Sequence, residues 1–178
     1  MIETKRLRLR RVTLSDADAR FMLRLVNDPG WLANIGDRNV HDLEQSRAYI
    51  QKTLDMYEKY GFGSLVMELK DTGEPIGTCG LVKRDSVEDV EVGYALLPEF
   101  RGRGLAIEGA QAVLDYARDV LKLERVAAIV TPANRDSIKV LERIGLAFVR
   151  PLTMANQDQV HLYLAHIAPQ SRTTSTAV

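Results

Sequence analysis

The stretch from Arg101 to Ala106, which reads Arg-Gly-Arg-Gly-Leu-Ala, carries the residue types that bind a diphosphate. It lies between an apolar strand pattern and a helical repeat, so it is expected to lead into the first turn of a helix. A helix N-terminus exposes unpaired N–H groups and the positive end of the helix dipole. Gly102 and Gly104 allow close approach and positive φ angles, and Arg101 and Arg103 add charge. We therefore predict that this turn binds the diphosphate of a nucleotide-containing cofactor. The alternative is an ordinary glycine-rich loop with solvated arginines.

The glycine pattern excludes two other phosphate-binding motifs. No Gly-Lys-Ser/Thr sequence is present, so the turn is not a nucleoside-triphosphate P-loop. The three-glycine fingerprint of dinucleotide-binding folds is also absent. The glycine pattern alone therefore does not identify the cofactor, and the residues around the turn must be considered.

A mixed order of strands and helices positions this turn. Alternating and β-branched runs predict strands over residues 7–12, 64–69, 75–83, 90–97, 125–131, 146–151 and 159–167. Apolar residues at helical spacing predict helices between Ser15 and Asn27, from about Asp42 to Tyr60, over 107–121 and from Arg135 to Ile144. No repeat or linker divides the chain, so the sequence predicts one mixed α/β domain.

Charge and composition narrow the function classes. Lys plus Arg total 24 and Asp plus Glu total 24, which argues against a general nucleic-acid binder. No apolar run is long enough to span a membrane, and no signal peptide is recognisable, so a cytoplasmic protein is expected. Cys79 lies in an apolar run and is expected to be a buried structural thiol. The three histidines are dispersed, so no metal site is expected.

Several motifs in order resemble the GCN5-related N-acetyltransferases (GNAT). The segment 97–106 is similar to that family's central motif, with Arg101, Gly104 and Ala106 at the patterned positions. Residues 91–96 resemble its fourth strand, and Asn134-x-x-Ser137 with Gly145 resembles its next block. Segments 6–10 and 34–38 resemble the Rim-type branch, which contains ribosomal-protein N-terminal acetyltransferases.

The resemblance implies a fold and a co-substrate. The fold class is α/β (α+β): a single domain over 1–168, with a mostly antiparallel sheet splayed between its fourth and fifth strands and flanked by helices. Residues 169–178 are expected to form a disordered tail. Acetyl-coenzyme A, with no metal, would lie in the opening. The implied contacts are Asn134, the fourth-strand residues Ala95, Leu96 and Leu97, and the turn residues Arg101, Gly102, Arg103, Gly104, Leu105 and Ala106.

The implied reaction is acetyl transfer to a primary amine, by direct attack in a ternary complex. A neutral amine is required, and a lysine amine is neutral only about once in 10³ at pH 7, so a base matters. Glu91 is the candidate base, because it shares a strand face with the small residues Gly93 and Ala95. Glu68 is an alternative base, and a salt-bridged structural role for Glu91 stays open. A water chain could also take the proton.

The chain departs from the family pattern at the position of the group that assists the leaving thiol. Many family members place a tyrosine where this chain has Leu141. Ser137 resembles the serine that the Rim-type branch places near the cofactor sulfur, and we assign it a hydrogen bond to the thiolate. A simple helix-start role for Ser137 is the alternative. The leucine also leaves open a non-catalytic acyl-coenzyme A-binding sensor on the same fold.

The acceptor site is expected to come from the early helices and the loop between them. Trp31, Asn34 and Arg38 lie in that loop and are the candidate substrate-binding residues. The acceptor is expected to be a protein N-terminus or a small amine, with no nucleic acid or membrane partner. The protein is expected to be a monomer or a homodimer.

Overall fold

One open sheet of eight strands forms the centre of the computed structural model, which describes residues 1–154 and 157–168. The strands are β1 (Ile2–Glu3), β2 (Leu7–Arg11), β3 (Ser64–Leu69), β4 (Pro75–Val82), β5 (Glu91–Leu96), β6 (Arg125–Val130), β7 (Ala147–Thr153) and β8 (Gln159–His166). Their order across the sheet is β1-β2-β3-β4-β5-β6-β8-β7. Neighbouring strands are antiparallel except β5 and β6, which are parallel.

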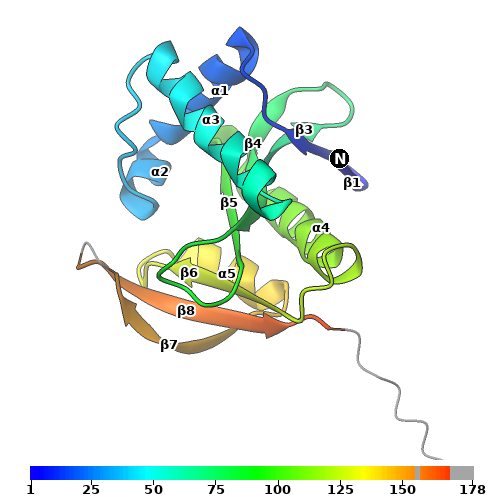
Figure 1. Ribbon diagram of the computed structural model, residues 1–178, viewed down its shortest axis with the longest axis vertical. Helices are drawn as coiled ribbons and strands as arrows, with labels where there is room; N and C mark the ends of the chain where they lie inside the picture. Colours follow the sequence, from blue (N-terminus) through cyan, green and yellow to red (C-terminus); the bar gives the residue numbers. More distant parts are fainter. Residues whose placement is uncertain (155–156, 169–178) are drawn as a thin grey trace, which may run out of the picture.

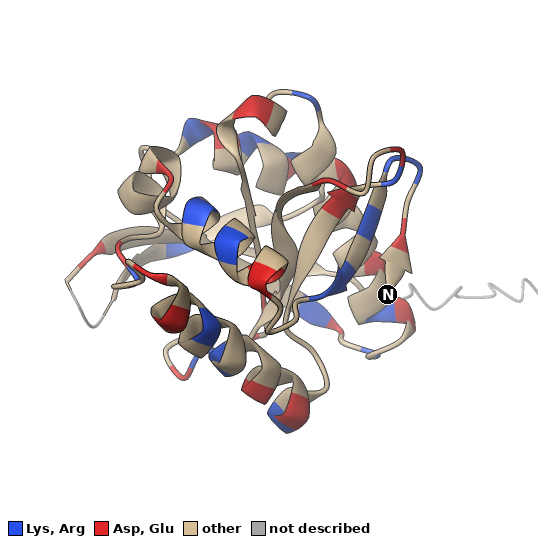
Figure 2. Cartoon of the chain, turned by 90° about the horizontal axis from the view of Figure 1, so that it is seen from above, with Lys and Arg blue, Asp and Glu red and all other residues tan. Residues whose placement is uncertain are grey.

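Five α-helices cover the two faces of this sheet (Figure 1). They are α1 (Asp16–Val26), α2 (Pro29–Asn34), α3 (Leu43–Tyr60), α4 (Leu105–Asp119) and α5 (Arg135–Arg143). A short 3₁₀ turn, η1 (Pro98–Phe100), connects β5 to the loop before α4. Both signs of charge occur on the same helices (Figure 2), in keeping with the balanced composition.

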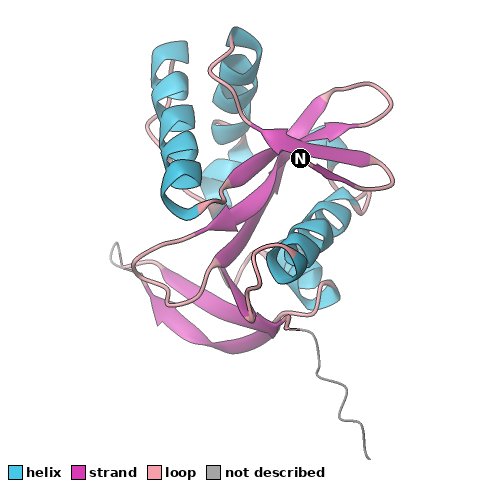
Figure 3. Cartoon of the chain, turned by 45° about the vertical axis from the view of Figure 1, so that its right-hand side comes forward, coloured by secondary structure: helices cyan, strands magenta, loops and turns pink. Residues whose placement is uncertain are grey.

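The helix α4 packs against the middle of one sheet face. A Cβ at Gly109 of α4 would lie 2.6 Å from Met67 Sδ and 3.8 Å from the Cβ of Cys79, so only glycine allows this approach. The helices α1, α2 and α3 lie over the other face of β3 and β4, where their side chains enclose a cavity. Figure 3 shows these two groups of helices on either side of the strands. As the sequence predicts, Cys79 is fully buried, and burial raises the pKa of its thiol.

The parallel strands β5 and β6 touch only at one end. Their Cα pairing is confined to Glu91 and Ala127, and the amide of Ala127 also donates to the Val90 carbonyl at 2.8 Å. By contrast, β4 and β5 pair from Gly77 and Leu96 through to Val82 and Glu91. In Figure 1, β5 runs steeply while β6 and β8 cross below it. The splayed sheet is therefore confirmed, between β5 and β6 in the numbering of the structure.

Besides the short 3₁₀ turn η1, one strand and one α-helix of the structure were not predicted. One is β1, which pairs with β2 through only two residues and is too short to show a periodic pattern. The other is α2, in the region that we predicted to be the loop between the early helices. Asp28 caps this helix and Pro29 is its first residue. The sequence did not reveal the helix, because an Asp-Pro pair is found at turns as well as at helix N-termini. Trp31 and Asn34 therefore lie on a helix, and the predicted tail at 169–178 lies outside the described residues.

Candidate active site at the splayed strands

The N-terminus of α4 differs from those of the other α-helices. Side chains of Ser15, Asp28, Asp42 and Asn134 each accept a hydrogen bond from a backbone N–H of α1, α2, α3 and α5. The residue at the start of α4 is Gly104, which has no side chain to do so. The first-turn N–H groups of α4 are therefore left without a side-chain cap.

Both glycines of the turn have left-handed backbone conformations. Their φ angles are 72° at Gly102 and 73° at Gly104, and residues with side chains rarely adopt this region. A Cβ at Gly102 would meet nothing within 4 Å, so the space beside it is open. The turn thus has the free amides, the conformation and the room that the diphosphate prediction requires, and the ligand contacts themselves stay a prediction.

The guanidinium of Arg101 does not face that space. It forms an ion pair with Asp28, and its Nε donates to the Leu96 carbonyl at 2.9 Å. Asp28 is almost fully buried and also accepts from the Trp31 amide. The positive charge that the sequence analysis assigned to the diphosphate is therefore already used, in fastening α2 to the end of β5.

Other contacts hold the turn from the opposite side. Arg6 Nη1 donates to the Arg103 carbonyl at 2.9 Å, and Arg6 Nε pairs with Glu108 of α4 at 2.6 Å. Among the described residues Arg103 has no ion-pair partner; its guanidinium lies 5.7 Å from the centre of the Phe100 ring. Of the two arginines in the turn, Arg103 is the one whose charge is available to an anionic ligand.

The predicted cofactor contacts on β5 follow the open edge of the splay. Past Glu91, β6 no longer pairs with β5, so the β6-facing edge of the strand is free. Two groups of the predicted segment are already engaged elsewhere. The Leu96 carbonyl binds Arg101, and the Leu97 amide donates to the Ile76 carbonyl at 2.9 Å. Ala95, Leu96 and Leu97 lie at the end of β5 that does not pair with β6, and part of their backbone is used to hold the strand. Their contacts with the cofactor stay a prediction.

Glu91 stands where β5 and β6 separate, and it is 3% exposed. Its Oε2 accepts from Arg84 at 3.0 Å, while its Oε1 is buried without a hydrogen-bond partner among the described residues. Burial raises the pKa of Glu91, and Arg84 and Lys83 partly oppose that rise. Two positions along the same face, a Cβ at Gly93 would meet nothing within 4 Å. The expected room beside the candidate base is therefore present.

Glu68, the alternative base, has a different environment. Its Oε1 accepts from Arg10 at 2.6 Å, and the same guanidinium binds Asp18 at 2.7 Å. Glu68 pairs with Pro75, at the end of β4 opposite to the one that pairs with Glu91. This ion-pair cluster fixes α1 to the sheet and gives Glu68 no place in the opening, which argues against it as the base.

Ser137 lies in the first turn of α5, and a residue that the sequence analysis missed lies against it. The phenol oxygen of Tyr94 is 2.9 Å from Ser137 Oγ and 3.0 Å from the Ser137 carbonyl oxygen. Leu141, the position at which many relatives have a tyrosine, is packed in the core. No sequence pattern shows this contact, because Tyr94 and Ser137 are 43 residues apart.

The Asn134 side chain is the cap of α5, and its Oδ1 accepts from the Ser137 amide at 3.1 Å. It is half-buried at the end of the turn that follows β6. The oxygen of this side chain is thus occupied within the helix. A role of Asn134 toward the cofactor stays a prediction.

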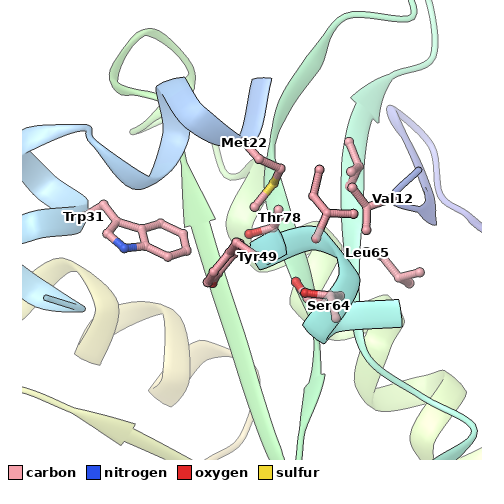
Figure 4. A pocket seen from close by; sticks show the side chains of 10 residues that line it. Val12, Met22, Trp31, Tyr49, Ser64, Leu65 and Thr78 are labelled. Carbon is pink, nitrogen blue, oxygen red and sulfur yellow. The ribbon is translucent and has the colours of Figure 1, made fainter. Parts of the chain in front are cut away.

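One of the three candidate acceptor residues, Trp31, lines the cavity over β3 and β4. It shares this lining with Met22, Tyr49, Ser64 and Thr78, as Figure 4 shows. The cavity has a volume of about 30 Å³, room for about two water molecules. The Trp31 Nε1 is buried without a hydrogen-bond partner among residues 1–154 and 157–168.

Arg38 and Asn34 occupy the edges of this region. Burial raises the pKa of Tyr49, and Arg38 and Arg84 oppose that rise, which places two guanidinium charges near its phenol. Asn34 at the end of α2 accepts from Thr131 Oγ1, just past β6, at 3.5 Å. The three predicted acceptor residues therefore do not form one cluster. Trp31 lines the cavity, Arg38 lies near Tyr49, and Asn34 contacts the far side of the splay.

The described residues form neither a metal site nor a membrane-spanning helix. Within 1–154 and 157–168, no group of three or more His, Cys, Asp or Glu side chains is placed to hold a metal ion. No helix in that part of the chain has the length and apolar character to cross a membrane.

Comparisons with known proteins agree on one family. Residues 6–147 match the family model described as "Acetyltransferase (GNAT) domain". An N-acetyltransferase of unassigned substrate, p20 from Bacillus licheniformis, is 34% identical over 143 residues, covering 80% of this chain and 79% of that protein. The crystal structure of an acetyltransferase from Agrobacterium tumefaciens superposes with a TM-score of 0.78 at 29% identity, covering 93% of each chain.

A third match is informative about the fold alone. A ribosomal L7/L12 α-N-protein acetyltransferase in complex with coenzyme A has a TM-score of 0.77 at 20% identity, covering 92% of this chain and 95% of that one. These comparisons give no support to a non-catalytic binding module.

Proposed function

Because this chain belongs to the GNAT acetyltransferase family and is an N-acetyltransferase, we propose that it binds acetyl-coenzyme A in the opening between β5 and β6. The observation that carries this proposal is the start of α4, where free amides meet two positive-φ glycines. Amides of residues 102–106 would bind the diphosphate, because the Arg101 amide already donates to the Pro98 carbonyl oxygen at 3.2 Å, and Arg103 would add the available charge. When bound, the thioester supplies an activated acetyl group.

A donor without the diphosphate tests this assignment. Acetyl-pantetheine carries the same thioester but lacks the group that the α4 turn is proposed to bind. We expect its KM to be at least tenfold higher than that of acetyl-coenzyme A, with a product formed from either donor. Equal KM values for the two donors would show that the turn does not bind the diphosphate.

The residues around Gly93 suit direct attack by an amine. Glu91 carries a carboxylate whose pKa is raised by burial, toward the range in which a base can take a proton near neutral pH. The open space beside Gly93 gives an acceptor amine room on the same face of β5. The acceptor proton would go to Glu91, directly or through a water. Initial-rate patterns that intersect rather than run parallel are expected for this ternary mechanism.

The acceptor is a primary amine whose neighbouring substituent is small, because the cavity lined by Trp31 that it would enter has a volume of only about 30 Å³. Ten residues line that cavity and none of them is acidic; its polar members other than Trp31 carry hydroxyl groups, and Figure 4 shows the six-membered part of the Trp31 ring facing them. A second ammonium group would find no carboxylate there and would face the guanidinium groups near Tyr49. A protein N-terminus or a small monoamine fits this lining better than a polyamine.

Trp31→Phe tests this acceptor assignment, since it keeps an aromatic ring but shortens the side chain that lines the cavity. A buried methylene group is worth about 0.8 kcal/mol, so losing contacts of this size should raise the KM for a good acceptor several-fold while the KM for acetyl-coenzyme A is unchanged. A panel of N-terminal peptides, monoamines and spermidine identifies that acceptor. Preferred acetylation of spermidine, or an unchanged acceptor KM in Trp31→Phe, would contradict the assignment.

A further inference from the structure

The side chain of Tyr94 bridges the opening between the splayed strands. Tyr94 lies on β5, three residues past the point where β5 and β6 last pair. Its phenol oxygen contacts Ser137 at two atoms of α5, at 2.9 Å and 3.0 Å. This pair of hydroxyl groups therefore lies between the two arms of the sheet, in the part of the molecule where the thioester is proposed to bind.

Counting the protons of this contact leaves two arrangements. The phenol has one proton, the serine hydroxyl has one, and the Ser137 carbonyl oxygen only accepts. In the first arrangement the phenol donates a hydrogen bond to the carbonyl oxygen, and the serine hydroxyl donates one to the phenol oxygen. In the second, the phenol donates to Ser137 Oγ, and the serine proton is free to point at a third group.

Only the second arrangement lets Ser137 help the departing thiol. Its backbone N–H is already donated to Asn134 Oδ1 at 3.1 Å, so the hydroxyl is the donor that remains to Ser137. We propose that Tyr94 is a positioning residue for acetyl transfer, whose phenol donates to Ser137 Oγ and thereby aims the serine proton at the leaving sulfur. This inference rests on the proposed function.

The step needs no proton transfer through the tyrosine. The amine nitrogen forms a bond to the acetyl carbon, the carbon–sulfur bond breaks, and its electron pair stays on sulfur. The amine proton goes to the base, and the thiolate takes a proton from water after release. Burial raises the pKa of the Tyr94 phenol, whereas a free thiol has a pKa of about 8.5. The phenol is therefore a weaker acid than the thiol and keeps its proton throughout. Tyr94 and Ser137 contribute hydrogen bonds to the developing negative charge.

A double-mutant cycle on kcat separates this role from simple fastening of β5 to α5. Tyr94→Phe keeps the ring and removes the hydroxyl, and we expect kcat to fall about five- to tenfold with the KM for acetyl-coenzyme A within twofold of wild type. Ser137→Ala should cost at least as much. In the Ser137→Ala background, Tyr94→Phe should then cost nothing further, because its partner is gone.

A matched control is available at Tyr57. It is a half-buried phenol, like Tyr94, and it donates to the Gly63 carbonyl oxygen at 3.2 Å, outside the opening. Tyr57→Phe therefore removes a comparable hydroxyl and should leave kcat unchanged. The Tyr94 proposal is overturned if Tyr94→Phe leaves kcat unchanged, if it raises KM instead of lowering kcat, or if its effect is the same with and without Ser137.

A second pair of variants decides the question if Tyr94→Phe does not fold. Ser137→Thr keeps a hydroxyl in the place where Tyr94 contacts it, whereas Ser137→Ala removes it. We expect kcat near the wild-type value for threonine and a fall of about five- to tenfold for alanine. Equal kcat values for these two variants would overturn the proposal.

Discussion

Replacing Gly104 by alanine should weaken coenzyme A binding, lower the stability of the fold, or both, because of the backbone conformation at this position. Its φ of 73° and ψ of 7° place it in the left-handed region at the start of α4. A residue with a side chain pays roughly 1–2 kcal/mol in that region. A Cβ there would lie 3.6 Å from Arg6 Nη2, an ordinary contact, so Gly104→Ala adds a conformational penalty without a clash.

The penalty lowers either the free energy of unfolding or the affinity for coenzyme A, depending on whether folding or binding forces residue 104 into the left-handed region. If the free turn relaxes away from it, coenzyme A must restore it on binding. A tenfold change in affinity corresponds to about 1.4 kcal/mol, so the Kd should rise roughly 5- to 30-fold. The free energy of unfolding would then fall by less than the full penalty.

Gly73 provides the control. It lies in the hairpin between β3 and β4 with a φ of 71°, and a Cβ there would meet nothing within 4 Å. Gly73→Ala carries the same penalty far from the opening, so it should lower the Tm by about 2–8 °C and leave coenzyme A affinity unchanged. Titration calorimetry and thermal unfolding measure both. If Gly104→Ala binds coenzyme A as tightly as Gly73→Ala does, the diphosphate does not depend on this conformation and the argument for the α4 turn fails.

Further predictions concern the base and the arginines. The raised pKa of Glu91 contributes stability that is complete below about pH 4.5 and is lost as pH rises through the folded pKa. Glu91→Gln should therefore lower kcat and remove the fall of wild-type activity toward acid pH. The difference in Tm between this variant and the wild type should be more favourable to the variant at pH 8 than at pH 5. A wild-type pH–rate profile in the variant would exclude Glu91 as the base. Arg101→Met should cost about 2 kcal/mol of stability, because it leaves Asp28 buried without its cation. Arg103→Met should spare stability and weaken coenzyme A binding, and the reverse pattern in thermal unfolding and calorimetry would show that the two roles are wrongly assigned.

The sequence predicts the fold well because its signals are local. The glycines of the α4 turn, the alternation along β5 and the helical repeat of α4 each depend on near neighbours in the chain, and the structure confirms those elements. The interpretation of the whole segment between the early helices as a loop was wrong, because Asp28 and Pro29 begin the helix α2 there.

The site is predicted less completely because its contacts join distant parts of the chain. Arg101 matches a family motif, yet its charge is neutralised by Asp28, 73 residues away. The parity of Glu91 predicts the face on which it lies but not the ion pair with Arg84 or the depth of its burial. Tyr94 shows no signal at all in the sequence, since its partner Ser137 becomes a neighbour only after β5 and α5 are assembled.

The short helix α2 links the two halves of the molecule. Asp28 at its start is fastened to Arg101 beside β5, and Asn34 at its end touches Thr131 beside β6. We therefore expect a change in the angle between the two strands to move α2 and, with it, Trp31 in the wall of the cavity. The proposed donor and acceptor sites would then be energetically coupled, and such a coupling is reciprocal. Any factor by which the bound donor tightens acceptor binding is also the factor by which the acceptor tightens the donor.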